Sequence, residues 1–194
     1  MTREFGFPLP NPTPMKILLL VIVSLVGVLV LAALVLLIAG SRMPREHRTQ
    51  LVRILPVSRT VVWAALTDYA AMPQWWPAVK SIRFEKLPDG TELTWNTDSH
   101  GEEVPFRTSE SRPNEKLVRV IAKDDLPFGG TWTFELADAG QGATRLTLTE
   151  DGFINPPIFR AMAQWFFGLD TTMKDFLVHF EKRVVALAGG EPVH

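Results

Sequence analysis

The sequence of 194 residues contains no cysteine. This absence excludes disulfides, cysteine metal sites and a lipid anchor on an N-terminal cysteine, and it leaves the redox state of the compartment open. The chain also has no excess charge of one sign, because 20 Lys and Arg residues nearly balance 21 Asp and Glu residues. No basic stripe stands out, so we expect no nucleic acid among its partners.

A third absence is local, because no charged residue occurs from residue 17 to residue 39. As a helix this run would be about 35 Å long, and the hydrocarbon core of a bilayer is about 30 Å thick. Core helices of soluble domains are seldom apolar on every face over such a length. We therefore predict a single-pass transmembrane helix over residues 17–40, which contacts the lipid bilayer through residues 17–39.

A cleaved signal peptide is the alternative interpretation of this run. Its apolar region is normally about 7–15 residues long and ends at a site with small residues in alternate positions. The present run is longer, and Leu37 and Ile38 place bulky side chains where a cleavage site needs small ones. We therefore expect the helix to be retained in the mature protein.

Basic residues indicate which side of the membrane holds the main domain. Only Arg3 and Lys16 precede the apolar run, whereas four arginines follow it closely. These are Arg42, Arg45, Arg48 and Arg53. Because the side richer in Lys and Arg usually stays in the cytoplasm, we predict a cytoplasmic soluble domain.

The chain divides into five parts by composition and pattern. Residues 1–16 form a proline-rich N-terminal tail that we expect to be extended. The transmembrane helix over residues 17–40 follows, and residues 41–48 form a charged connector. Residues 49–188 contain the alternating and periodic patterns of one folded domain, and residues 189–194 form a short C-terminal tail.

The folded part is rich in strand patterns separated by turn signals. In the segment around Trp132, Phe134 and Leu136, apolar residues alternate with polar ones, which is typical of an antiparallel sheet with one covered face. We predict seven strands, at residues 49–55, 79–87, 92–97, 104–110, 116–123, 131–136 and 144–150.

Helical patterns flank these strands. Ser58 is a candidate N-cap for a short helix, and a second short helix or turn covers residues 70–76. One long helix is predicted over residues 156–187, with an apolar stripe at helical spacing. The stripe contains Phe159, Met162, Phe166, Leu169, Met173, Leu177, Phe180 and Val184. The expected fold class is α+β, with a curved antiparallel sheet around this helix and a gap between them that suits a small apolar molecule.

Several short segments of the sequence resemble segments of one known family. They are residues 62–69, residues 75–77, residues 126–132, and residues 149–152 leading into Asn155 and Pro156. Together with the element order, they resemble the START-like helix-grip superfamily, also called SRPBCC. Within it they are similar to the branch of polyketide cyclases, dehydrases and lipid transport proteins.

The resemblance covers about residues 47–188 and implies a deep apolar cavity between the sheet and the C-terminal helix. It does not imply one function, because members include lipid carriers, hormone binders, cyclases and hydrolases. We expect the cavity to hold a hydrophobic small molecule such as a lipid, a quinone or a polyketide. Eight residues are the predicted ligand contacts: Trp95, Phe106, Trp132, Phe134, Phe159, Met162, Phe166 and Met173. The alternative for each is a place in a dry core.

A second set of aromatic residues is predicted at the pocket mouth, and consists of Trp75, Trp76, Trp165 and Phe167. They could gate the pocket, touch lipid headgroups, or pack against the short helices. Three polar residues are weak catalytic candidates: Glu150, Glu110 and Arg107. The two carboxylates share strand parity with inward residues, but a strand end or a bulge would turn them to water.

We expect no metal and no cofactor, because the cluster of Asp98, His100 and Glu102 lies in a turn without a paired histidine at ligand spacing. Three functions therefore stay open. The first is a membrane-anchored binding or transfer module. The second is an enzyme of the cyclase, dehydratase or hydrolase type that uses the polar candidates. The third is a membrane-tethered adaptor whose core is filled by its own side chains.

Overall fold

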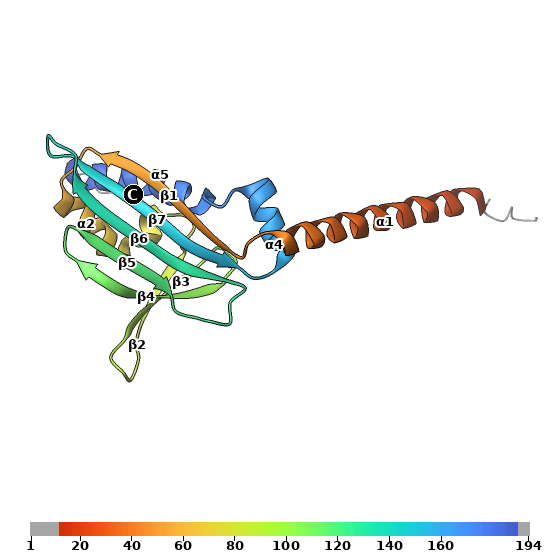
Figure 1. Cartoon of the computed structure of the whole chain (residues 1–194), viewed down its shortest axis with the longest axis horizontal. Helices are drawn as coiled ribbons and strands as arrows, with labels where there is room; N and C mark the ends of the chain where they lie inside the picture. The colour runs from red at the N-terminus through yellow and green to blue at the C-terminus, as the bar shows by residue number, and fades with distance from the viewer. Residues whose placement is uncertain (1–11, 190–194) are drawn as a thin grey trace, which may run out of the picture.

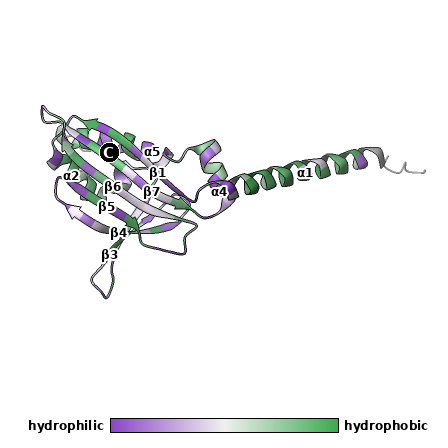
Figure 2. Ribbon diagram, in the orientation of Figure 1, coloured by the Kyte–Doolittle hydropathy of each residue, from purple (hydrophilic) through white to green (hydrophobic). Residues whose placement is uncertain are grey.

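The computed structural model of the protein describes residues 12–189. Helix α1 (Pro12–Arg42) projects from one end of a domain of sheet and helices (Figure 1). Within the described residues, Met15–Arg42 is the one helix that is long and apolar enough to cross a membrane, judged by length and composition. Figure 2 shows hydrophobic colouring along most of its length, and none of its most apolar window is buried.

The boundaries around α1 differ from the predicted ones. The helix begins at Pro12 rather than residue 17, because proline is tolerated in a first turn where no amide partner is needed. The rest of the predicted tail, residues 1–11, lies outside the described residues, as do residues 190–194 of the C-terminal tail. The predicted connector is also shorter, because strand β1 already begins at Glu46, where it pairs with Phe153.

The predicted curved antiparallel sheet is confirmed, and it contains seven strands. Their spatial order is β1-β7-β6-β5-β4-β3-β2, so consecutive strands are neighbours except where β1 pairs with β7. All neighbours are antiparallel. The strands are β1 (Glu46–Leu55), β2 (Ser81–Lys86), β3 (Glu92–Thr97), β4 (Glu103–Arg112), β5 (Lys116–Ile121), β6 (Phe128–Asp138) and β7 (Thr144–Ile154).

One face of the sheet is covered by helices. After β1 come α2 (Arg59–Thr67), the short turn η1 (Tyr69–Ala71) and α3 (Met72–Trp75), and the chain ends in α5 (Thr171–Gly189). Figure 1 shows α5 running behind the sheet. The core consists of the apolar sides of these helices against the inward residues of β1, β5, β6 and β7. In α5 the predicted stripe is buried from Met173 to Val184.

The single long C-terminal helix was a wrong prediction. The chain forms α4 (Pro157–Met162), then η2 (Ala163–Phe167), a π-helical turn, and breaks at Gly168 before α5 begins. Gly168 has φ 82° and ψ 138°, a conformation that is open to glycine and strained for other residues. The apolar stripe is thereby cut in two, and only its second half lies against the sheet.

Helix α4 packs against the C-terminal end of α1. Arg160 is buried there without a carboxylate partner among the described residues, and its guanidinium donates to backbone carbonyl oxygens instead. The acceptors are Gly40 at 2.9 Å, Ile154 at 3.0 Å and Asn155 at 2.6 Å. A Cβ on Gly40 would overlap the carbonyl of Pro157, so glycine permits this close approach. These contacts join α1 to the domain.

Candidate functional site

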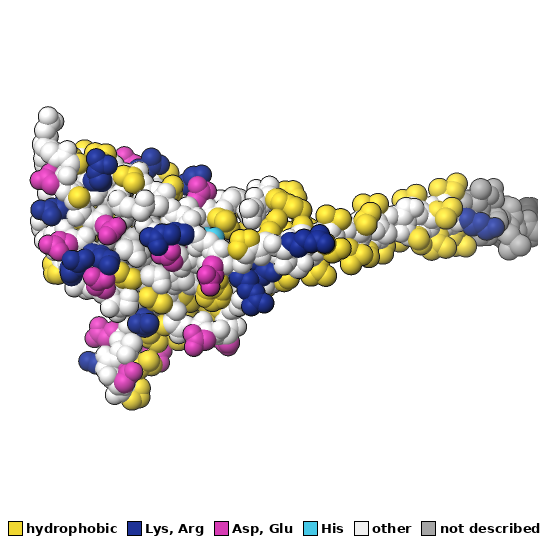
Figure 3. All heavy atoms as spheres, viewed as in Figure 1, with side chains coloured by type: hydrophobic (Ala, Val, Ile, Leu, Met, Phe, Trp, Pro, Cys, Tyr) yellow, Lys and Arg dark blue, Asp and Glu magenta, His cyan; other side chains and the backbone are white. Residues whose placement is uncertain are grey.

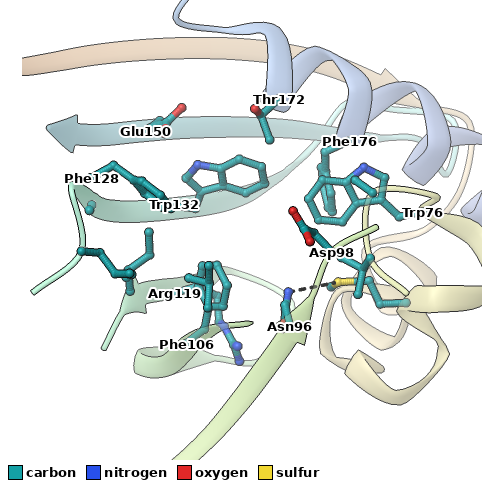
Figure 4. A pocket seen from close by; sticks show the side chains of 18 of the residues that line it. Trp76, Asn96, Asp98, Phe106, Arg119, Phe128, Trp132, Glu150, Thr172 and Phe176 are labelled. Carbon is teal, nitrogen blue, oxygen red and sulfur yellow. Dashed lines mark hydrogen bonds between the residues drawn. The ribbon is translucent and has the colours of Figure 1, made fainter. Parts of the chain in front are cut away.

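A cavity of about 680 Å³ lies between the sheet and the helices. Its walls come from β1, β3 to β7, the short helices α2 and α3, and the junction of η2 with α5. The predicted gap is therefore present, and its volume falls within the range of about 300–1,000 Å³ that ligand pockets occupy. Figure 4 shows the side chains that line it.

Aromatic side chains close one end of the cavity. Phe176 of α5 is at the centre of this cluster, and its ring centroid lies 5.1 Å from that of Trp76 and 5.5 Å from that of Trp132. Phe134 and Trp75 complete it at 5.7 Å and 5.6 Å from Phe176. These edge-to-face and tilted contacts are favourable geometries for aromatic pairs, so they fix the rings that form this wall.

Hydrogen bonding fixes the position of Trp76. Its indole Nε1 donates to Oδ2 of Asp175 over 2.7 Å, and this bond ties α3 to α5. Trp75 and Trp76 are only 7% and 8% exposed. Their predicted place at the pocket mouth is therefore wrong. Both indoles lie in the interior because the turn at residues 69–75 folds back over the sheet.

Arg119 is the one cation among the cavity-lining residues apart from His47 in its protonated form. Its guanidinium lies 4.0 Å from the ring centroid of Tyr69, donates to the Thr108 hydroxyl at 3.1 Å, and also donates to the Thr94 hydroxyl. Burial lowers the pKa of Arg119 from its ordinary value, although arginine stays charged at neutral pH. No ion pair of Arg119 is found among the described residues. A charge held in this way can meet a polar oxygen of a ligand.

Glu150 of β7 lies on the opposite wall, where Figure 4 shows it near Thr172. Its side chain is 22% exposed, and Oε1 is 4.0 Å from Nε2 of His47. Burial raises the pKa of Glu150 above its ordinary value, while Trp132 and His47 oppose the rise. A carboxyl group with a raised pKa beside a cavity is a candidate proton donor or acceptor.

Some of the residues that line the cavity are exposed, and they indicate where it opens to the surface. Asp98, which follows β3, points toward the cavity in Figure 4, and its Oδ1 accepts from the backbone N–H groups of His100 and Glu102. These hydrogen bonds lower the pKa of Asp98. Phe128, which is 41% exposed, and the exposed Thr172 also line the cavity.

Three residues predicted to face inward on the sheet lie on its outer face. Trp95 donates to Glu85 over 2.7 Å and lies under the Arg83 guanidinium. The inward side of β3 is taken by Asn96, which lines the cavity, and by the buried Thr94, which accepts from Arg119. Arg107 is exposed and lies outside the cavity, since its neighbour Phe106 points inward.

Glu110 is turned outward by a bulge. The register of β4 shifts between Thr108 and Glu110, so the alternation changes and Glu110 comes opposite the outward Val118. There it pairs with Lys116 at 2.7 Å and with Arg112 at 3.0 Å. Lys116 lowers the pKa of Glu110. Of the three polar candidates, the structure therefore brings only Glu150 to the cavity.

The break at Gly168 removes the first half of the predicted helical stripe from the cavity. Phe159 and Phe166 are 55% and 69% exposed, and neither they nor Met162 line the cavity. Met173 is fully buried in the core but also lies outside the lining. Phe106, Trp132 and Phe134 do line it, as expected. Trp165 and Phe167, predicted at the mouth, are exposed at 50% and 62% and are not lining residues either.

Sequence reasoning missed several lining residues. Arg119 alternates with Leu117, which would have placed it on the inward face if strand parity had been followed through β5. His47 was assigned to the connector, whereas β1 carries it into the sheet. Phe176 lies three residues after Met173 and so belongs to the buried side of α5.

Residues 46–185 match the family model described as polyketide cyclase / dehydrase and lipid transport. The chain belongs to this family. The match covers the whole sheet and nearly all of α5, and it leaves α1 outside. Family and fold together indicate a protein that binds hydrophobic ligands or one of the cyclase type. A comparison with curated proteins finds no match.

Solved structures from the same superfamily share the fold at low sequence identity. A START superfamily protein from Mycobacterium smegmatis has a TM-score of 0.56 at 18% identity, over 73% of this chain and 99% of that one. The Zhui aromatase/cyclase from Streptomyces sp. R1128 has a TM-score of 0.59 at 10% identity, over 76% and 99%. Norcoclaurine synthase from Thalictrum flavum, solved with a transition-state analogue, has a TM-score of 0.58 at 11% identity, over 74% and 96%.

The raised pKa of Glu150 gives a pH-dependent stability of known sign. The unfolded carboxyl has its ordinary pKa, so stability falls as pH rises from that value, 4.5, through the raised folded value. We expect Glu150→Gln to raise the midpoint of thermal unfolding at about pH 8 and to lose this advantage at about pH 4. Thermal unfolding of the detergent-solubilised chain at both pH values measures the difference.

Glu110→Gln is the matched control, because the pKa of Glu110 is shifted downward. Removal of that carboxylate should bring no gain at either pH. If Glu150→Gln failed to stabilise the protein at the higher pH, Glu150 would not be a desolvated carboxyl group.

Proposed function

We propose that this protein is a membrane-tethered binding or transfer module for a hydrophobic small molecule held in the cavity between sheet and helices. The observation that carries the proposal is a cavity of about 680 Å³ with a wall of aromatic side chains. A filled core was the condition for the adaptor hypothesis, and a void of this size speaks against it. The aromatic wall suits a lipid, a quinone or a polycyclic molecule.

The membrane tether is supported by the length and composition of α1. Its most apolar window has a mean hydropathy of 3.3, and the described residues bury none of that window. A ligand of this apolar kind partitions into lipid. A cavity held next to the bilayer therefore samples the ligand at a high effective concentration. The arginines that follow α1 favour a cytoplasmic position of the domain.

The ligand should carry one polar oxygen. Arg119 contributes a guanidinium to the wall of a mainly apolar cavity and is held in place by Tyr69, Thr94 and Thr108. A buried cation is stabilised by an acceptor, and a carboxylate is the acceptor that best matches its fork of donors. The ligand chemistry that fits is therefore an apolar body with a carboxylate at one end.

A plug at the open end of the cavity tests the binding function. We expect Thr172→Trp to weaken uptake of a hydrophobic fluorescent probe by at least about tenfold, because an indole at this exposed lining position fills the entrance. Val178→Trp is the matched control, since Val178 is exposed on the same helix and does not line the cavity. Fluorescence titration of the detergent-solubilised chain gives both affinities. Equal uptake by the two variants would contradict the proposal.

Arg119 should decide between acidic and neutral ligands. We expect Arg119→Leu to lower the affinity for a pyrene-labelled fatty acid by about 1.5–3 kcal/mol, which is the usual contribution of a hydrogen bond to a charged group. Affinity for a pyrene-labelled alkane of the same length should stay the same. Arg107→Leu, on the outer face of the neighbouring strand, should change neither affinity. An equal loss for both probes would show that Arg119 shapes the cavity only.

An enzyme is the second candidate function, and Glu150 is the observation that favours it. This carboxyl group lines the cavity, has a raised pKa and lies 4.0 Å from His47. Such a pair can move a proton to or from a bound molecule. Two proteins of the same fold are described as an aromatase/cyclase and a synthase. Likeness at this identity supports the fold, so the reaction has to be tested on this chain.

Native mass spectrometry and lipid extraction of the purified chain would name a bound molecule for this test. If the protein is an enzyme that uses Glu150, the wild-type chain converts that molecule and Glu150→Gln binds it without conversion, with a rate loss of at least about 100-fold. Glu110→Gln, on the outer face, should convert it normally. Recovery of the same molecule unchanged from all three proteins would leave binding or transfer as the function.

A further inference from the structure

An exposed segment without exposed charge lies beside the end of α1. From Gly152 to Leu169 the only ionisable residue is Arg160, and it is buried. Four large aromatic side chains of α4 and η2 are at least half exposed and together form what we call the aromatic face: Phe159, Trp165, Phe166 and Phe167. Soluble surfaces rarely leave so many large apolar side chains together in water.

The aromatic face is fixed relative to α1. Arg160, in the middle of α4, donates to the Gly40 carbonyl near the end of α1, and Gly40 packs directly on Pro157. Figure 1 shows α4 beside the point where α1 leaves the domain. Any membrane that α1 crosses therefore has a defined position relative to α4 and η2.

That position is the membrane interface. The apolar run of α1 ends at Ala39, one residue before the contact with α4, and the first charge after it is Arg42. Because this run is about as long as a bilayer core is thick, its end lies at the boundary between acyl chains and headgroups. Tryptophan and phenylalanine are the residues that lie favourably at this depth.

The open end of the cavity lies on the same side of the domain. Only three residues separate the end of α1 from the start of β1, so the start of β1 marks the membrane end of the sheet. Antiparallel pairing brings Ile154 of β7 and Phe128 of β6 to that end, together with the β3–β4 turn. Gly168 and Thr172, which follow the aromatic face in sequence, line the opening.

At this end of the domain, basic residues lie beside α4 and acidic residues lie on the turns that follow β3 and β5. Exposed Arg42 and Arg45 lie at the end of α1, next to α4, where cations can meet lipid phosphates. Acidic residues are concentrated on the turns that follow β3 and β5, among them Glu102, Asp124 and Asp125. In Figure 3 basic side chains gather where α1 meets the domain, while basic and acidic side chains are intermixed over the rest of the visible face. The membrane is therefore expected on the side of α4 and away from the acidic turns.

We propose that α4 and η2 dock on the lipid bilayer, with the aromatic face inserted among the headgroups, so that the opening of the cavity faces the membrane surface. This rests on the proposed function, in which α1 crosses the membrane. The aromatic face adds a second attachment to the membrane beside that of α1. An apolar ligand then passes between bilayer and cavity along the aromatic face.

Site-specific labelling tests the docking on the full chain, because the absence of cysteine permits single labels without background. The Phe166→Cys variant is labelled at the new cysteine with an environment-sensitive nitrobenzoxadiazole group. It is then placed in nanodiscs of phosphatidylcholine and phosphatidylglycerol, with one protein copy in each nanodisc. We expect the emission of this label to shift to the blue relative to the emission of the same group in water. The emission should also be quenched when the lipids carry nitroxide groups near the headgroup. Phe84→Cys is the matched control, since Phe84 is also an exposed aromatic residue, 60% exposed, on β2. Its label should show neither effect.

A third label, Leu29→Cys in the middle of α1, separates the two proposals. If nitroxides deep in the bilayer quench this label and the label at position 166 stays in water, α1 spans the membrane and the docking proposal is wrong. If the label at position 29 is not quenched, α1 does not span the bilayer and the proposed membrane tether is wrong. Shielding of position 166 that occurs only in vesicles with many copies of the protein would assign the aromatic face to a second copy and would also overturn the docking proposal.

Discussion

A seven-stranded sheet that curves around one helix has more concave surface than the helix can cover. An α-helix with its side chains is about 10–12 Å wide, so α5 covers only part of a sheet of seven strands. In this protein Trp75, Trp76 and Trp132 fill the space on one side by packing around Phe176 of α5. Away from this aromatic cluster, Gly129, Gly130 and Gly168 are among the residues that line the cavity. The cavity and its opening follow from this unequal filling.

The break at Gly168 has two consequences that belong together. It ends η2 and lets α5 begin at the angle needed to lie along the sheet, so it completes one wall of the cavity. It also releases α4 and η2 from the core, so their aromatic side chains face outward. Arg160 then holds this released segment against α1 through three backbone carbonyls, which satisfy a buried charge without an acidic partner. One glycine and one arginine thus set the relation between the cavity and the helix outside the domain.

Polar groups in the cavity are few and are each held by protein partners. Arg119 is oriented by two hydroxyl groups and an aromatic ring, and Glu150 lies within reach of His47. Such preorganised groups can orient a ligand with little further loss of side-chain freedom. The same arrangement serves a carrier that discriminates between ligands and an enzyme that moves a proton, which is why members of one family can differ in function with little change of fold.

The sequence by itself determined the apolar helix, the number of strands, the antiparallel sheet and the family, because these depend on local periodicity and on short recognisable phrases. Strand parity also placed Phe106, Trp132 and Phe134 correctly on the inward face. Tertiary structure alone decided the rest. The bulge that turns Glu110 outward needs the partner strand to define it. The break at Gly168 interrupts a helical pattern that continues in the sequence without a change of period. Strand parity could have separated the two arginines, because Arg119 alternates with the inward Leu117 and Arg107 is next to the inward Phe106. That Arg119 borders a cavity rather than a packed core was decided by the curvature of the whole sheet, since only the tertiary structure leaves space in front of it.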